Sequence, residues 1–277
     1  MIKPVMQVKD LTVSYGDGCE YCHIAENKLE KNRCPKCRTV WAVRNLSFEL
    51  YKSEILGVVG ESGSGKTTFM KSLYFDAPVT SGQAFLEAYD DGATDIFSVS
   101  SQQQRAIRNN LMGMVYQNPL LGLLMDFSNG GNIAQKLIAA GHRNVESMQN
   151  RTFELLNHME IPTSRVKEPP KNFSGGMQQR VQISKAIANN PPVLLLDEVT
   201  TGLDLSVQAR VLDLIRTVQK KLNISIIIVS HDLAVIRMLS DRTVVMLDGQ
   251  IVEHGFTDQI LEDPQHWFTQ TLVHSLI

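Results

Sequence analysis

The feature that most restricts the fold is a short apolar run that ends in a glycine-rich turn. Residues 54–60, EILGVVG, have no alternating polar positions, as expected for a strand buried on both faces. The turn GESGSGKT follows at 60–67, and the segment KTTFMKSLYF after it has a helical composition. A buried strand, a glycine-rich loop and a helix in this order predict an α/β fold.

The turn fits the pattern G-x-x-x-x-G-K-[ST] at every fixed position. Its glycines allow backbone N–H groups to wrap phosphates, Lys66 reaches the β and γ phosphates, and the Thr67 hydroxyl binds Mg²⁺. The helix that begins here adds a favourable dipole for an anion. The predicted nucleotide-binding residues of this segment are Gly60, Ser62, Gly63, Ser64, Gly65, Lys66, Thr67 and Thr68.

A second apolar strand, at 193–197, ends in Asp197 and is followed at once by Glu198. In a phosphate-loop enzyme, an Asp at a strand end supports Mg²⁺ and an adjacent carboxylate orients or deprotonates the attacking water. On its own, an Asp-Glu pair after a strand is usually a helix cap in solvent. Together with the phosphate loop it predicts a nucleotide hydrolase.

The rest of the chain divides into three regions with different sequence patterns. The start alternates apolar and polar residues in VMQVKDLTVSY and again in AVRNLSFEL, which predicts a strand pair. Residues from about 98 to 178 read as helices separated by Pro and Gly clusters, and 179–277 return to buried strands alternating with helices, ending in one or two short helices. We expect one domain over 1–277, with a parallel sheet covered by helices on both faces.

A third motif narrows the class. Residues 173–180, FSGGMQQR, lie just before the Asp-Glu strand and resemble the signature of ATP-binding cassette (ABC) ATPases. Further positions resemble that family in its own order. They are Tyr15 (the aromatic that stacks on adenine), Gln117 (the glutamine loop, also a Mg²⁺ ligand), Gly202-Leu203-Asp204 (the loop between subunits) and His231 (the switch histidine).

The resemblance implies an ABC nucleotide-binding domain, a P-loop NTPase with a RecA-like parallel core, an N-terminal antiparallel β subdomain and a helical signature subdomain. It implies an ATPase that uses ATP and Mg²⁺, with Glu198, His231, Gln117 and Lys66 as catalytic residues. Two chains would pair so that the signature residues of one face the ATP of the other. Those residues are Ser174, Gly175 and Gly176, and Asp204 belongs to the same nucleotide-binding set.

Two positions depart from the family pattern. Val199 replaces the usual Pro after the catalytic Glu, and Ser53 replaces a common Gly before Glu54. Neither position supplies a group that touches phosphate. We therefore expect activity to be retained.

The segment QNPLLGLLMDFSNGGNI after Gln117 lacks the text expected of oligopeptide transporter subunits, and resembles the ATP-binding subunit of the phosphonate C-P lyase system. That resemblance implies an ATPase that remodels a soluble lyase complex in phosphonate catabolism. The alternatives are the ATPase subunit of an oligopeptide or dipeptide importer with a membrane permease, and a non-hydrolytic scaffold. The sequence leaves open whether the dimer is a homodimer or pairs with a related ATPase.

All four cysteines lie together, as Cys19-x-x-Cys22 and Cys34-x-x-Cys37, within an insertion at 16–40. Four thiolates at this spacing predict a structural zinc site with a closed ligand shell. An iron–sulfur cluster and unligated thiols remain alternatives. The insertion follows Tyr15, so we expect a knob near the adenine.

The net charge of −2 argues against nucleic acid as the main partner, since the chain lacks a basic excess to neutralise phosphates. The longest aliphatic runs, VLLL and ISIIIV, are far shorter than a membrane span. The start, MIKPVMQVKDLTVSY, has charges scattered through it and no continuous apolar run of a signal peptide. From this start and the short aliphatic runs we expect a cytoplasmic protein, at most peripheral to a membrane.

Overall fold

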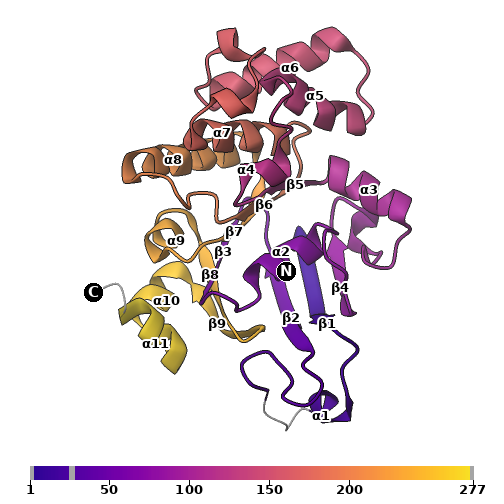
Figure 1. Cartoon of the computed structure of the whole chain (residues 1–277), viewed down its shortest axis with the longest axis vertical. Coiled ribbons are helices and arrows are strands. Elements are labelled where there is room, and N and C mark those ends of the chain that lie inside the picture. The colour runs from indigo at the N-terminus through magenta and orange to yellow at the C-terminus, as the bar shows by residue number, and fades with distance from the viewer. Residues whose placement is uncertain (1–2, 25–28, 275–277) are drawn as a thin grey trace. The chain divides into compact units, whose positions relative to one another are not determined.

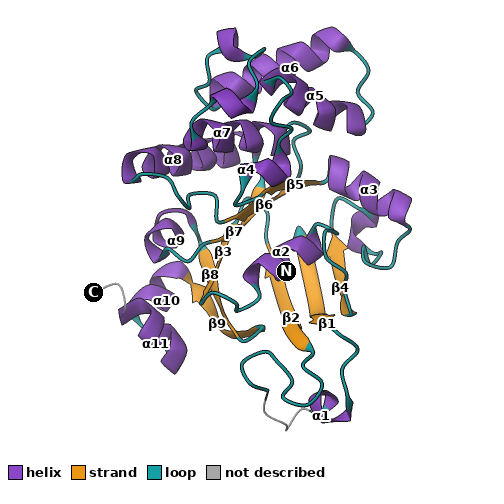
Figure 2. Ribbon diagram, viewed as in Figure 1, coloured by secondary structure: helices purple, strands orange, loops and turns teal. Residues whose placement is uncertain are grey.

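The computed structural model describes residues 3–24 and 29–274 and divides into two compact units. The first unit contains Met1–Tyr51, Ile55–Ser100 and Val229–Ile277, and the second contains Lys52–Glu54 and Ser101–Ile228. Figure 1 traces the elements along the chain and Figure 2 colours them by type.

The first unit begins with a three-stranded antiparallel sheet in the order β2-β1-β4. The strand pair predicted from alternation is confirmed, because β1 (Met6–Tyr15) pairs antiparallel with β2 (Val40–Leu50). The third strand, β4 (Ser81–Leu86), joins the other edge of β1 and was not predicted. A 3₁₀ turn, η1 (Asp90–Gly92), comes after β4.

The same unit holds the strand before the phosphate loop. Every residue of β3 (Ile55–Gly60) is buried, as predicted, and β3 pairs in parallel with β8 (Arg242–Leu247). β9 (Gln250–Phe256) runs antiparallel to β8. The helices of this unit are α1 (Glu20–His23), α2 (Lys66–Leu73), α9 (Leu233–Leu239), α10 (Thr257–Glu262) and α11 (Trp267–His274).

The second unit contains three strands in the order β5-β6-β7. β5 (Met112–Val115) and β6 (Val193–Asp197) pair in parallel, and all residues of β6 and β7 (Ser225–Val229) are buried. β5 lies inside the stretch predicted to be mostly helical. Its four residues are too few to show a strand period, and only their pairing with β6 makes them a strand.

The helices predicted in this stretch are present, and polar caps start several of them. Ser128 and Asn144 accept backbone hydrogen bonds at the first turns of α5 and α6. The long α helices of the second unit are α3 (Ser101–Asn110), α5 (Asn129–Ala139), α6 (Val145–His158), α7 (Gly175–Ala186) and α8 (Leu205–Leu222). Short turns are α4 (Pro119–Gly122), η2 (Thr163–Arg165) and η3 (Pro170–Asn172).

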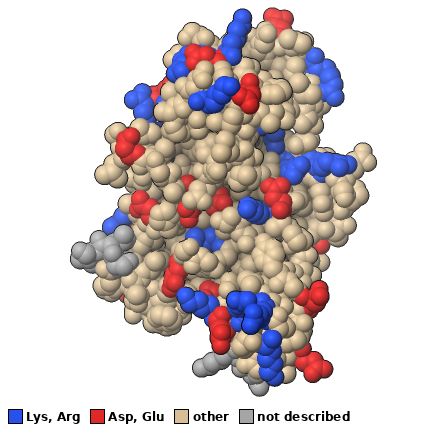
Figure 3. Space-filling model, viewed as in Figure 1, with Lys and Arg blue, Asp and Glu red and all other residues tan. Residues whose placement is uncertain are grey.

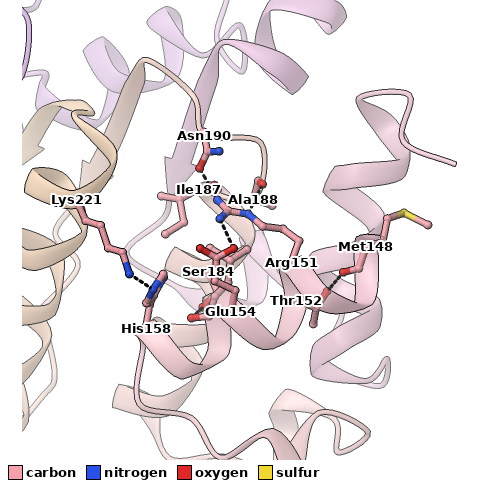
Figure 4. A network of polar contacts seen from close by, with 11 residues as sticks. Met148, Arg151, Thr152, Glu154, His158, Ser184, Ile187, Ala188, Asn190 and Lys221 are labelled. Atoms are coloured by element: carbon pink, nitrogen blue, oxygen red, sulfur yellow. Dashed lines mark hydrogen bonds and ion pairs between the residues drawn. The ribbon is translucent and has the colours of Figure 1, made fainter. Parts of the chain in front are cut away.

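A polar network fixes α6 to the end of α7 (Figure 4). The Arg151 guanidinium donates to the carbonyl oxygens of Ala188 at 3.1 Å and Ile187 at 3.3 Å, and to the Asn190 side chain. It also pairs with Glu154 at 2.8 Å. Because three of these partners are oxygens at the end of α7, one side chain orders that helix terminus.

On the face drawn in Figure 3, basic and acidic side chains are interspersed. This distribution agrees with the small net charge and shows no basic stripe on that face. Among the described residues, no helix has the length and hydropathy needed to cross a membrane.

Candidate functional site

The phosphate loop connects β3 to α2 and depends on glycines at two close contacts. Gly60 has φ +153°, and a Cβ there would lie 2.2 Å from the Met246 carbonyl oxygen. Gly65, the residue before α2, has φ +100°, and a Cβ there would lie 1.9 Å from the Ala42 carbonyl oxygen. No side chain fits at either position, so the loop keeps its backbone course only with glycine.

Lys66 is buried and folds back into this loop. Its ammonium group donates to the carbonyl oxygens of Gly60 and Glu61, both at 2.7 Å, and to Ser64 Oγ at 3.3 Å. Thr67 and Thr68 follow in the first turn of α2. The phosphate loop therefore carries the Lys66 ammonium and the N-terminus of α2 close together, and both favour binding of an anion.

The second unit carries a carboxylate site at the end of β6. Asp197 is 3% exposed, and Glu198 after it has φ +46°, a conformation rare outside glycine. Glu198 Oε2 accepts hydrogen bonds from Gln117 Nε2 at 2.9 Å and from Thr201 Oγ1 at 3.2 Å. Gln117 and Glu198 are therefore brought together.

Sequence reasoning did not identify Thr201. No motif marks it in the run Val199-Thr200-Thr201-Gly202, which passes for an ordinary turn. Its spacing of three residues from Glu198, across a tight turn, is the only signal available.

The signature segment opens α7, with Ser174 as its N-cap residue. A Cβ on Gly176 would lie 2.3 Å from Val207 Cγ1, so this glycine allows α7 and α8 to approach closely. Asp204 caps α8 by accepting from the Val207 N–H at 3.0 Å and from Ser206 Oγ at 2.7 Å. These hydrogen bonds lower the pKa of Asp204.

Tyr15 and His231 belong to the first unit. Tyr15 ends β1 with 49% of its surface exposed, which leaves its ring accessible. His231 lies between the buried Ser230 and Asp232, the N-cap of α9. Ser62 and Gly63 are exposed at the tip of the phosphate loop.

The four cysteine sulfurs lie within 4.8 Å of one another, and all four thiols are free. Three Sγ–Sγ distances, Cys19–Cys22, Cys19–Cys34 and Cys22–Cys37, are each 3.8 Å. A disulfide needs about 2.05 Å, whereas a tetrahedron with metal–sulfur bonds of about 2.3 Å has edges of about 3.8 Å. The quartet has the dimensions of a shell for one tetrahedral ion.

The pKa values of two of the thiols also bear on whether the quartet holds a cation. Hydrogen bonds at Thr39 lower the pKa of Cys37 to about 6. A backbone hydrogen bond at Cys22 lowers the pKa of Cys19, but burial and the neighbouring thiols outweigh it and raise the value to about 11. Negative charges this close together repel one another, so four thiolates side by side are stabilised by a cation among them.

The sequence matches the ABC transporter family over residues 43–201. The chain belongs to the ABC transporter family. Among its relatives is the "putative phosphonates utilization ATP-binding protein PhnK" of Escherichia coli K12, 44% identical over 84% of this chain and 90% of that protein. The oligopeptide transport ATP-binding protein OppD of Bacillus subtilis is 38% identical over 86% of this chain and 67% of that protein.

Solved structures agree on the fold. The dimeric ATP-binding cassette MJ0796, bound to ADP and Pi, superposes with a TM-score of 0.75, 24% identity, and coverage of 91% of this chain and 98% of that one. CbiO1 of Clostridium perfringens gives a TM-score of 0.76 at 22% identity, covering 94% and 91%. The predicted ABC ATPase fold is confirmed.

The family assignment confirms that this protein is an ATPase of the ABC class. The cysteine quartet ends at Cys37, before the matched range begins at residue 43. The matched range includes the positions of the phosphate loop, Gln117, the signature segment and the two carboxylates, and it does not include the cysteine insertion.

Proposed function

We propose that this ABC ATPase closes as a dimer around two MgATP and uses that motion to remodel a soluble complex that breaks carbon–phosphorus bonds. The observation that carries the proposal is the 44% identity to PhnK over nearly the full length of that protein, against 38% for OppD. The segment after Gln117, which resembles the C-P lyase ATP-binding subunit, supports the proposal as well. An importer that couples to a membrane permease is the second candidate, favoured by the OppD likeness.

In this proposal the loop backbone, Lys66, Thr67 and Asp197 hold MgATP, and Gln117 completes the Mg²⁺ set. Tyr15 supports the adenine. The Lys66 ammonium donates here to the Gly60 and Glu61 carbonyl oxygens and to Ser64 Oγ, and in this proposal it turns from them to the phosphates and neutralises their charge.

Glu198 is the proposed base. Water attacks the γ-phosphorus, Glu198 accepts its proton, and the bond to the ADP oxygen breaks. The hydrogen bonds from Gln117 and Thr201 hold the carboxylate oxygen in place, and His231 supports the attacking water. Ser174, Gly175 and Gly176 act on the ATP of the partner chain, with Asp204 in the loop beside it.

The test of the base is Glu198→Gln, with Asp213→Asn on the exposed face of α8 as matched control. Loss of general base catalysis predicts hydrolysis lowered about 10²- to 10⁴-fold. ATP stays bound and the dimer stays closed, which size exclusion with ATP detects. Hydrolysis at the normal rate in Glu198→Gln would disprove the role.

The partner is tested by affinity purification of the tagged chain from cells grown on a phosphonate, with and without detergent. Co-purification of soluble lyase subunits supports the proposal. Recovery of a membrane permease in their place supports the importer. The Glu198→Gln variant, locked with ATP, should retain its partner longer than the wild type.

We also propose that the quartet holds one structural Zn²⁺. Its ligands are Cys19, Cys22, Cys34 and Cys37, and the 3.8 Å separations support a single ion over a cluster, which places several irons and sulfides between its thiolates. Elemental analysis of protein purified without added metal should give about one zinc per chain. Iron with sulfide, or no metal, overturns this.

A further inference from the structure

A side chain of the cysteine insertion contacts the phosphate loop within the first unit. Asn32 Nδ2 donates to the Gly63 carbonyl oxygen at 3.2 Å. Asn32 lies in a tight turn that is closed by hydrogen bonds between Glu30 and Arg33 at 2.9 and 3.1 Å. The donor therefore comes from an ordered turn and acts on the tip of the nucleotide loop.

Gly63 borders open space on the side where a Cβ would lie. Gly63 has φ +84°, and a Cβ built on it meets no heavy atom within 4 Å. The peptide that links Gly63 to Ser64 is planar, and its N–H donates to the Glu61 carbonyl oxygen at 3.2 Å. The bond from Asn32 holds the other end of the same plane. Because its carbonyl oxygen and its N–H are both hydrogen-bonded, the Gly63–Ser64 peptide resists rotation.

Asn32 is in turn fixed by the insertion. Its carbonyl oxygen accepts from the Trp41 N–H at 2.7 Å, and Arg33 forms a bridge with Val40 at the start of β2. Trp41 packs in a cluster with the buried Cys22 and Cys34. A short path of hydrogen bonds and packing thus leads from two metal-binding sulfurs to the loop.

We propose that Asn32 is a positioning residue of the ATP site, held in place by the metal of the cysteine quartet. This rests on the zinc centre proposed above. When the quartet holds its ion, the Asn32 turn is ordered and the Gly63–Ser64 peptide keeps one orientation, so the tip of the loop is already ordered before ATP binds. Without the ion, the four sulfurs lose their common centre, and ATP must order the loop itself.

The first test compares Asn32→Ala and Asn32→Asp with Lys36→Ala, a matched change elsewhere in the insertion, where the lysine ammonium lies over the Tyr21 ring. Loss of one hydrogen bond of about 1 kcal/mol predicts a KM for ATP raised about fivefold, with kcat unchanged. Asn32→Asp should raise KM more, because its carboxylate repels both the carbonyl and the phosphates. Lys36→Ala should match the wild type.

Zinc content and unfolding midpoint are measured for every variant. An unchanged KM in Asn32→Ala that still contains zinc overturns the inference and leaves the zinc centre standing. A fall in kcat with unchanged KM also overturns it, since positioning of the loop acts on ATP binding.

The second test removes the metal with a chelator and repeats the measurement. We expect metal-free wild type to show the raised KM of Asn32→Ala, and metal-free Asn32→Ala to show no further rise, because both changes break one path. Independent, additive effects overturn the link. Absence of metal from the purified protein refutes the zinc proposal instead, so the two failures are distinguishable.

Discussion

The phosphate loop and the cysteine insertion are neighbours in the first unit, but they are built in opposite ways. The loop is made by backbone: Gly60 and Gly65 take positive φ values where a side chain would strike a carbonyl oxygen. The insertion is made by side chains: two knuckles, fifteen residues apart from Cys19 to Cys34, place their sulfurs 3.8 Å from each other. The loop depends on residues without a Cβ atom, and the insertion depends on the thiol groups of its cysteine side chains.

This difference decides how each region fails. A backbone loop is damaged by adding an atom, because there is no space for it. A metal shell is damaged by removing one ligand, because the remaining three no longer close it. Of the four predictions below, ordered from the largest expected effect to the smallest, the first two test this contrast directly.

Cys34→Ser should have the largest effect, on metal content. Cys34 is fully buried, and a hydroxyl is a far weaker zinc ligand than a thiolate. We expect zinc to fall from about one per chain to nearly none. Elemental analysis measures it, with Lys36→Ala as control, and full zinc retention in Cys34→Ser would contradict the four-ligand shell.

Gly65→Ala and Gly63→Ala form a matched pair in the loop. Gly65→Ala places a methyl 1.9 Å from a backbone oxygen and should destabilise the fold by about 3 kcal/mol or more. Gly63→Ala meets no neighbour and carries only the strain of φ +84°, about 1 kcal/mol. Urea unfolding measures both. Equal losses would show that steric exclusion does not define the loop.

Lys66→Ala tests whether the buried ammonium serves ATP. Loss of charge-assisted hydrogen bonds worth about 1.5–3 kcal/mol predicts ATP affinity lowered roughly tenfold to hundredfold. Lys136 is the control, since it is also buried and donates to two carbonyl oxygens, of Arg108 and Met112. Lys136→Met should keep the ATP affinity of the wild type, and a similar loss in both variants would refute a specific role.

Lys136 should instead make stability depend on pH. Burial lowers its pKa from 10.5 to about 7, so between these values the unfolded chain binds the proton more tightly than the folded chain. Unfolding free energy should rise with pH over that window, by on the order of 1 kcal/mol per unit. Lys136→Met should lower this slope and leave the part due to Lys185, whose pKa burial lowers to about 8, and Lys220→Met, exposed on α8, should retain the full slope. Unfolding at pH 7, 8 and 9 compares them, and identical slopes would contradict the assignment.

Local patterns alone determined much of this protein. The buried strand before Gly60, the loop and its helix, and the strand ending in Asp197 are all readable because each depends on neighbours in the chain. So are the two cysteine knuckles, whose members are three residues apart. The antiparallel β1–β2 pair followed from period-2 alternation.

Only the tertiary structure decided the contacts between distant residues. β4 and β5 are strands because they pair with β1 and β6, and their own sequences show no pattern that predicts a strand. Glu198 accepts a hydrogen bond from Gln117, which lies 81 positions earlier in the chain. Asn32 reaches Gly63 only because the insertion folds back over the loop. A hydrogen bond of this kind depends on where two backbones meet, and residue type and local period carry no record of that position.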